Sequence, residues 1–157
     1  MPALLHLQVN LSDSNIPQEH EFQLWLDILL SREKRPLEVN ILIVDTEEGA
    51  QYNQTYRHKV GPTNVLSFPF EQPEGLDLPI LGDIVLCAPV ILSEANAQKK
   101  SLKAHYAHLT IHGCLHLLGY DHIKEEDANQ MEALEVNIMN KLEYPNPYEN
   151  GETVDHA

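Results

Sequence analysis

Histidines gather in one stretch of the chain, His112-Gly113-Cys114-Leu115-His116-Leu117-Leu118-Gly119-Tyr120-Asp121-His122. His112 and His116 are four residues apart, so on a helix they lie about 40° apart around the axis and about 6 Å along it. Both rings can then reach one point. His122 would face away if the helix continued, but Gly119 can adopt the left-handed conformation that ends a helix. The chain can therefore turn back and bring His122 to the same point.

This arrangement of histidines is typical of a metal site. Three neutral imidazoles around one point are the ligands of a catalytic zinc, which keeps a fourth position open for water. We predict that His112, His116 and His122 bind one Zn²⁺ per chain. Asp121 is either an outer residue that orients a ligand or an exposed turn residue. Without a metal, these residues would be ordinary core or surface histidines.

Other potential ligands and nucleophiles lie nearby. His105 and His108 fall on nearly the same helical face as His112, but farther along the helix from the metal. His108 is a candidate supporting residue, whereas we expect His105 to be solvated. Cys114 lies roughly 200° around the helix from the neighbouring histidines and is expected to be a small buried residue, as is Cys87.

Hydrophobic periodicity predicts an α+β fold, in which a small mixed sheet of about four strands packs with helices. The metal site lies on a long helix, as in zincin-like proteins. Thr46 is expected to cap the second helix. Alternating residues predict strands at 4–9 (with Leu5, Leu7 and Val9 on its buried face) and 37–43. Two further strands are expected at 65–70 and 80–86. Helices are expected from Pro17 to about Arg35, at 46–57, at 89–118 with an interruption near 99–101, and at 125–142.

Length and composition set the outer limits. The chain has 157 residues, of which 43% are hydrophobic, and this predicts one domain, over residues 1–144, with a flexible tail over residues 145–157. With its predicted metal site, we expect this domain to be a metal-dependent hydrolase. A net charge of −14 argues against a generic nucleic-acid binder but allows a small local site. Two cysteines make no disulfide framework. Without a signal peptide or a long apolar run, we expect a cytoplasmic protein with no membrane partner.

A second segment carries positive charge. Arg57, His58 and Lys59 form the densest cluster of basic residues in this acidic chain. A planar guanidinium suits bidentate contact with a phosphate. The same residues also suit a solvated helix end, where cations lie near the negative end of the helix dipole. Both interpretations stay open on charge alone.

The spacing of His112, His116, Gly119 and His122 equals that of the metzincin metalloproteases. In those enzymes a glutamate follows the first histidine and acts as the general base. Here that position is Gly113, and loss of the general base lowers the reaction rate by about 10²–10⁴-fold. The site is therefore expected to be hydrolytic, with peptides not the obvious substrate.

Three separate segments resemble the YbeY family of bacterial rRNA-maturation endoribonucleases. They are Tyr-Arg-x-Lys followed by Pro-Thr-Asn-Val-Leu-Ser-Phe (Tyr56 to Phe68), Leu-Gly-Asp-Ile (Leu81 to Ile84), and the histidine run from His112 to His122. Their order and spacing also fit. The resemblance spans nearly the whole chain except the tail, and no motif position departs from the family pattern.

The resemblance implies a compact α+β domain with zinc on His112, His116 and His122. It implies single-strand-specific cleavage of RNA in the maturation of the 3′ end of 16S rRNA and in ribosome quality control. Arg57 matches an arginine important for catalysis, which we interpret as binding phosphate and stabilising charge. Asp83 also matches the family pattern, with either a structural or a catalytic role.

The working hypothesis is metal-assisted hydrolysis of a phosphodiester, with the proton acceptor unidentified. Acidic surface away from the site should weaken binding to naked RNA, so we expect the ribosome or an assembly factor to provide specificity. Two alternatives stay open. One is a zinc peptidase-like hydrolase, and the other is a ribosome-assembly binding protein with a purely structural zinc.

Overall fold

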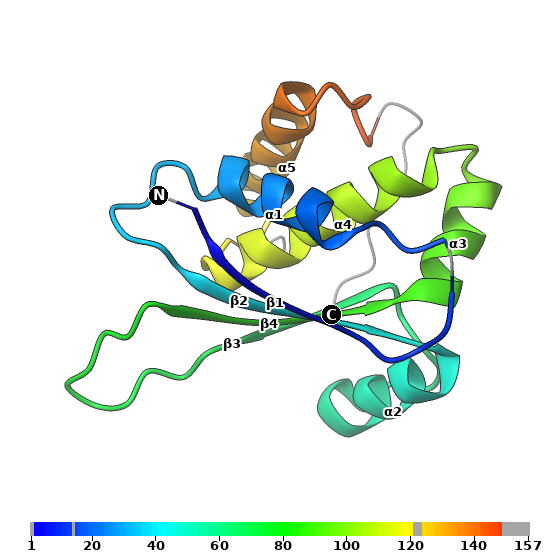
Figure 1. Cartoon of the computed structure of the whole chain (residues 1–157), viewed down its shortest axis with the longest axis horizontal. Helices are drawn as coiled ribbons and strands as arrows, with labels where there is room; N and C mark the ends of the chain where they lie inside the picture. Colours follow the sequence, from blue (N-terminus) through cyan, green and yellow to red (C-terminus); the bar gives the residue numbers. More distant parts are fainter. Residues whose placement is uncertain (1, 14, 121–123, 149–157) are drawn as a thin grey trace.

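The computed structural model describes residues 2–13, 15–120 and 124–148. In that part of the chain it contains four strands and five helices (Figure 1). Their order confirms the predicted α+β fold. In sequence they are β1 (Leu4–Val9), α1 (Glu19–Leu29), β2 (Glu38–Val44), α2 (Thr46–Arg57), β3 (Val65–Pro69), β4 (Ile80–Cys87), α3 (Ala88–Ala97), α4 (Leu102–Leu117) and α5 (Glu125–Lys141).

The four strands form one mixed sheet in the order β1-β2-β4-β3. β1 and β4 both run parallel to β2, while β3 pairs antiparallel with β4 and forms one edge. α4 lies across one face of the sheet with α1 and α5 beside it, and α2 lies on the opposite face (Figure 1). Three helices therefore cover one face of the sheet, whereas α2 covers part of the other.

α4 is the central helix of the molecule, because it is buried on almost every side. It contacts β3 and β4 below it and α1, α3 and α5 around it. Gly113 makes the close approach to the sheet possible. A Cβ atom at this position would lie 3.0 Å from Ser67 Oγ and 3.2 Å from a Val65 methyl group.

The predicted break in the long helical segment is confirmed. α3 ends at Ala97, Lys99 has a positive φ of 55°, and α4 starts after Ser101, whose side chain accepts a hydrogen bond from the Ala104 amide. Gly119 has a φ of 102°, which confirms the predicted left-handed residue after the helix.

Local details differ from the sequence analysis at the ends of elements. Asp45, not Thr46, caps α2, because its carboxylate accepts from the Glu48 amide at 2.9 Å. α1 begins at Glu19 and ends at Leu29, earlier than the expected stop at 35–36. Val9, expected on the buried face of β1, is 42% exposed because it lies near the end of this edge strand.

The chain stays packed beyond residue 144. Pro147 is buried, and its carbonyl accepts a hydrogen bond from Lys100 Nζ at 3.1 Å. Tyr148 reaches α4 and α5, where it contacts His108 and Glu135. Of the predicted tail, residues 145–148 thus rest on the helices, and residues 149–157 lie outside the described part of the chain.

Candidate metal centre

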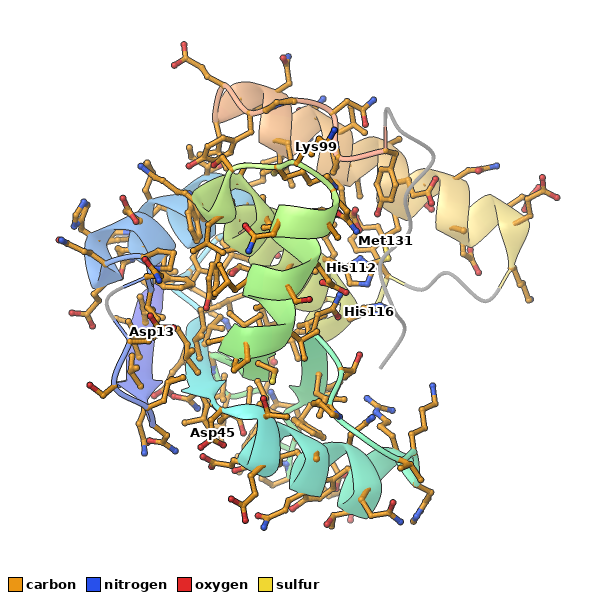
Figure 2. The ribbon with its side chains drawn as sticks, turned by 90° about the vertical axis from the view of Figure 1, so that its right-hand side faces the viewer. Asp13, Asp45, Lys99, His112, His116 and Met131 are labelled. Atoms are coloured by element: carbon orange, nitrogen blue, oxygen red, sulfur yellow. The ribbon has the colours of Figure 1, made fainter. Side chains whose placement is uncertain are left out.

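His112 and His116 project from the same side of α4 (Figure 2). Their Nε2 atoms are 3.2 Å apart and their ring centroids 4.7 Å apart. Two imidazoles on successive turns of one helix thus converge, as their spacing predicts. His112 is buried, whereas His116 is half-buried and lies closer to the surface.

Hydrogen bonds set which ring nitrogen faces the point of convergence. His112 Nδ1 is 2.6 Å from Glu135 Oε1, and His116 Nδ1 is 3.1 Å from the Tyr120 carbonyl oxygen. A carboxylate and a carbonyl only accept, so in the neutral rings Nδ1 carries the proton and Nε2 keeps a lone pair. Gly119 positions the Tyr120 carbonyl, because it turns the chain back after α4.

The histidine pair fits two ligands of a tetrahedral zinc. Zinc–nitrogen bonds of about 2.0–2.1 Å place two ligand nitrogens roughly 3.3 Å apart. The observed 3.2 Å between the two Nε2 atoms agrees with that spacing. His122 and Asp121 lie outside the described residues, within which no group of three His, Cys, Asp or Glu side chains could hold a metal. The three-histidine ligand set stays a prediction.

Glu135 on α5 is the residue that sequence reasoning missed. It is fully buried and accepts hydrogen bonds from His112, from His108 Nε2 at 2.7 Å, and from the Tyr148 hydroxyl. Burial alone would raise the pKa of Glu135, but the hydrogen bonds and charges of His108 and His112 outweigh it and lower the pKa to about 2. A buried carboxylate that holds the second nitrogen of a histidine is typical of metal sites.

A signal for Glu135 was present in the sequence. Met131 and Ile138, four residues before and three residues after Glu135, are both on the buried face of α5. A glutamate between them must enter the interior, where it needs partners.

The two outer histidines of α4 behave differently. His108 has the supporting position considered for it, because it shares Glu135 with His112. Burial lowers the pKa of His108. The expectation that His105 is solvated is wrong: it is only 3% exposed, and its Nε2 lies 2.9 Å from Glu94 Oε1 on α3. α3 covers this part of α4, which helical position alone did not reveal.

Both cysteines are buried, as predicted. Burial raises the pKa of the Cys114 thiol and of the Cys87 thiol, so neither forms a thiolate readily.

Gly113 leaves no space for a general base at the position that carries one in metzincins. Ser67 Oγ donates to the Gly113 carbonyl at 3.0 Å, and the packing around Gly113 would crowd even a methyl group. A glutamate would need the sheet and α4 to separate. The absence of that base is therefore built into the contact between α4 and β3.

Arg57, at the end of α2, lies at the edge strand β3. Its Nη2 donates to the Ser67 carbonyl at 3.1 Å, and Ser67 in turn bonds α4 next to His112. Its Nε is buried and makes no hydrogen bond to any described residue. Asp83 lies on the face of the sheet opposite α4, on the side of α2, and accepts from Asn40 Nδ2 at 2.7 Å, a structural contact.

Among the residues described, no helix is long and apolar enough to cross a bilayer.

The fold and the site together define a class: an α+β domain with converging histidines on a central buried helix. The model of the family "Endoribonuclease YbeY" matches residues 7–143. Proteins named endoribonuclease YbeY from Pseudomonas savastanoi pv. phaseolicola and Pseudomonas syringae pv. tomato are each 50% identical to this chain over 153 residues, covering 97% of this chain and 92% of theirs. The chain belongs to the YbeY family.

A solved structure has the same fold. The solution structure of TM1509 from Thermotoga maritima superimposes with a TM-score of 0.60 at 21% identity, and the match covers 96% of this chain and 97% of that one.

Proposed function

We propose that this chain is a metal-dependent endoribonuclease that cleaves single-stranded RNA, with Zn²⁺ held by His112, His116 and His122. Membership of the YbeY family supports endoribonuclease activity. The observation that carries the metal site is the pair of Nε2 atoms 3.2 Å apart, oriented by Glu135 and by the Tyr120 carbonyl.

The chain's own residues prepare the site. When bound, the metal supplies Lewis acidity toward a phosphate oxygen and an acidified water. Glu135 holds His112 in the tautomer that ligates through Nε2, and this also raises the basicity of the ring. Both oxygens of Glu135 already accept hydrogen bonds from histidines, so Glu135 orients a ligand and does not take the reaction's proton.

Arg57 is the proposed group that stabilises charge on the scissile phosphate. The Ser67 carbonyl fixes Nη2, while Nε has no acceptor among the described residues. A phosphate oxygen is an acceptor that suits a guanidinium group. Ser67 joins β3 to Gly113, so the guanidinium and the histidines share one rigid support.

The substrate we propose is the 3′ end of 16S rRNA, and the compartment of ribosome assembly, the cytoplasm, is the proposed place of action. A net charge of −14 opposes nonspecific binding to RNA. We therefore propose that the ribosome or an assembly factor presents the substrate. Tight, sequence-specific binding to naked RNA at physiological salt would contradict that part of the proposal.

The test is cleavage of a labelled single-stranded RNA by the wild type and by His116→Ala, with bound metal quantified in both. We expect the wild type to cleave and the metal-depleted variant not to. Equal cleavage by both would overturn the metal-dependent mechanism. Product ends then identify the nucleophile: a 2′,3′-cyclic phosphate indicates attack by the RNA 2′-hydroxyl, and linear phosphate ends indicate attack by water.

Arg57→Ala tests the phosphate contact separately. We expect cleavage to fall by about 10²–10³-fold while the bound metal is unchanged. Arg35→Ala is the matched control, because Arg35 is an exposed arginine that pairs with Asp77 away from the site. Unchanged cleavage by Arg57→Ala would remove this residue from the mechanism.

A further inference from the structure

The face of the sheet opposite α4 carries a cavity of about 610 Å³ that the proposed mechanism does not use. A row of paired residues crosses its floor, from His6 on β1 through Asn40 on β2 and Asp83 on β4 to Phe68 on β3. α2 closes one side of the cavity with Tyr52 and Tyr56. The cavity thus combines aromatic rings at the β3 end with hydrogen-bonding groups in its middle.

Tyr52, Tyr56 and Phe68 form a continuous aromatic platform. The rings of Tyr52 and Tyr56 are stacked with centroids 6.0 Å apart, and Tyr56 meets Phe68 edge-on at 5.1 Å. Tyr56 is 57% exposed although it is a large aromatic side chain. An exposed ring held at a fixed angle by two other rings can stack with a flat ligand at little entropic cost.

The platform is directly beside the proposed phosphate contact. The Arg57 guanidinium carbon lies 5.9 Å from the centroid of the Phe68 ring, and Arg57 follows Tyr56 in the chain. Phe68 also follows Ser67, whose carbonyl fixes Arg57. A cation and aromatic rings side by side match the alternation of phosphate and base along an unpaired strand.

The floor of the cavity favours a base over a phosphate. Asp83 carries a negative charge that repels phosphate, and its hydrogen bond from Asn40 engages Oδ1. The amino and imino groups of nucleobases are donors that suit carboxylate and amide oxygens. The charge therefore changes from positive at Arg57, beside the Phe68 ring at the rim, to negative at Asp83 on the floor of the cavity.

We propose that the aromatic platform of Tyr52, Tyr56 and Phe68 is a subsite that stacks an unpaired nucleobase of the RNA, one that lies next to the phosphate held by Arg57. The RNA strand passes over the free edge of β3, with its phosphate at Arg57 and its base on the outer face of the sheet. This inference rests on the proposed function. Tyr56 acts as a positioning residue that selects single strands, because a paired base cannot reach the platform.

Steady-state cleavage of a short single-stranded RNA tests the subsite with Tyr56→Ala and Tyr56→Phe. Stacking on an aromatic side chain predicts a KM about 5- to 100-fold higher for Tyr56→Ala, with kcat little changed, and recovery in Tyr56→Phe. Leu76→Ala is the control, because Leu76 is a similarly exposed large side chain in the β3–β4 loop. Wild-type KM for Tyr56→Ala, or no recovery in Tyr56→Phe, would overturn the proposal.

A binding measurement distinguishes failure of the nucleobase subsite from failure of the proposed function. The probe is a single-stranded RNA with one 2-aminopurine, placed at successive positions, whose fluorescence is quenched when the base stacks. We expect position-dependent quenching with the wild type and with His116→Ala, and its loss with Tyr56→Ala. Quenching without any cleavage would support the subsite while the proposed function fails. Equal quenching by Tyr56→Ala and wild type would overturn the subsite and would favour a protein partner on this face of the sheet.

Discussion

Glu94 on α3 and Glu135 on α5 both pair with buried histidines of α4, and only the contact with Glu135 has the features of a metal site. His105 Nε2 is 2.9 Å from Glu94 on α3, and His112 Nδ1 is 2.6 Å from Glu135 on α5. Both histidines are buried. At His112, however, a second histidine lies one helical turn away, and the two Nε2 atoms are 3.2 Å apart. At His105, Glu94 also accepts a hydrogen bond from the Asn64 side-chain amide at 3.0 Å.

The comparison shows that a buried histidine paired with a carboxylate does not by itself indicate a metal ligand. The pair at His105 ties α3 to α4 and to the turn before β3, which is a structural role. The pair at His112 leaves Nε2 directed to a shared point, which is a binding role. Convergence of lone pairs distinguishes the two.

The largest expected effect separates the two histidines by metal content. Replacing His112 with alanine removes a proposed ligand, so bound zinc should fall to less than about a tenth of the wild-type amount. Replacing His105 with alanine should leave bound zinc unchanged, because His105 pairs with Glu94, which is not a proposed metal ligand. Elemental analysis of both purified variants is the measurement. Equal loss of zinc in the two variants would break the distinction.

Glu135 and Glu94 should likewise differ in their effect on zinc affinity. Glu135→Gln cannot hold both histidine N–H groups, so zinc affinity should fall by about 10- to 100-fold. Glu94→Gln should change it less than about twofold. Competition with a fluorescent zinc chelator measures both affinities. A weaker zinc affinity in Glu94→Gln than in Glu135→Gln would reverse the assignment.

Protonation of Glu135 should contribute to the acid unfolding of the metal-free protein. The pKa of this carboxyl is lowered from 4.5 to about 2 in the folded state. Its ionised form therefore stabilises the fold above pH 4.5, and this contribution is lost as the pH falls toward 2. The difference is on the order of 3 kcal/mol.

Urea unfolding of the metal-free protein at about pH 5 and about pH 3 measures this loss. Glu135→Gln should show a much smaller difference between the two pH values than the wild type. Glu94 also has a lowered pKa, so Glu94→Gln is a demanding control that should keep most of the wild-type difference. A pH dependence unchanged by Glu135→Gln would contradict the assignment of Glu135 as the acid-sensitive group.

The smallest effect concerns the residues after α5. Tyr148→Phe removes the hydroxyl that donates to Glu135 Oε2, which should reduce the free energy of unfolding by about 1 kcal/mol. Zinc affinity should stay within about twofold, since His112 bonds the other oxygen. Tyr144→Phe is the control, because Tyr144 also follows α5 but is not among the described residues that donate a hydrogen bond to Glu135. A loss of zinc as large as that of Glu135→Gln would mean that Tyr148 belongs to the metal site.

Much of the fold followed from local sequence rules. Alternation predicted β1 and β2, the strands expected at 65–70 and 80–86 are present as β3 and β4, and the turn at 99–101 separated α3 from α4 as expected. The cap of α2 was placed at Thr46 rather than Asp45, because both residue types cap helices and only the backbone conformation distinguishes them. Such errors shift an element's end without changing the topology.

The site was predicted only as far as one helix could reveal it. The spacing of His112 and His116 on α4 determined their convergence, so sequence alone found it. Glu135 comes from α5 and Glu94 from α3, and local periodicity contains no information on which helix packs against which histidine. His105 was therefore predicted to be solvated when it is buried.

The central claim, that three histidines hold a zinc with one open position, is tested most directly by zinc X-ray absorption of the metal-loaded protein. We predict three imidazole nitrogens at about 2.0–2.1 Å and one oxygen from water. A shell of four protein ligands would indicate a structural zinc, and a shell with sulfur or with fewer than three imidazoles would contradict the proposed ligands.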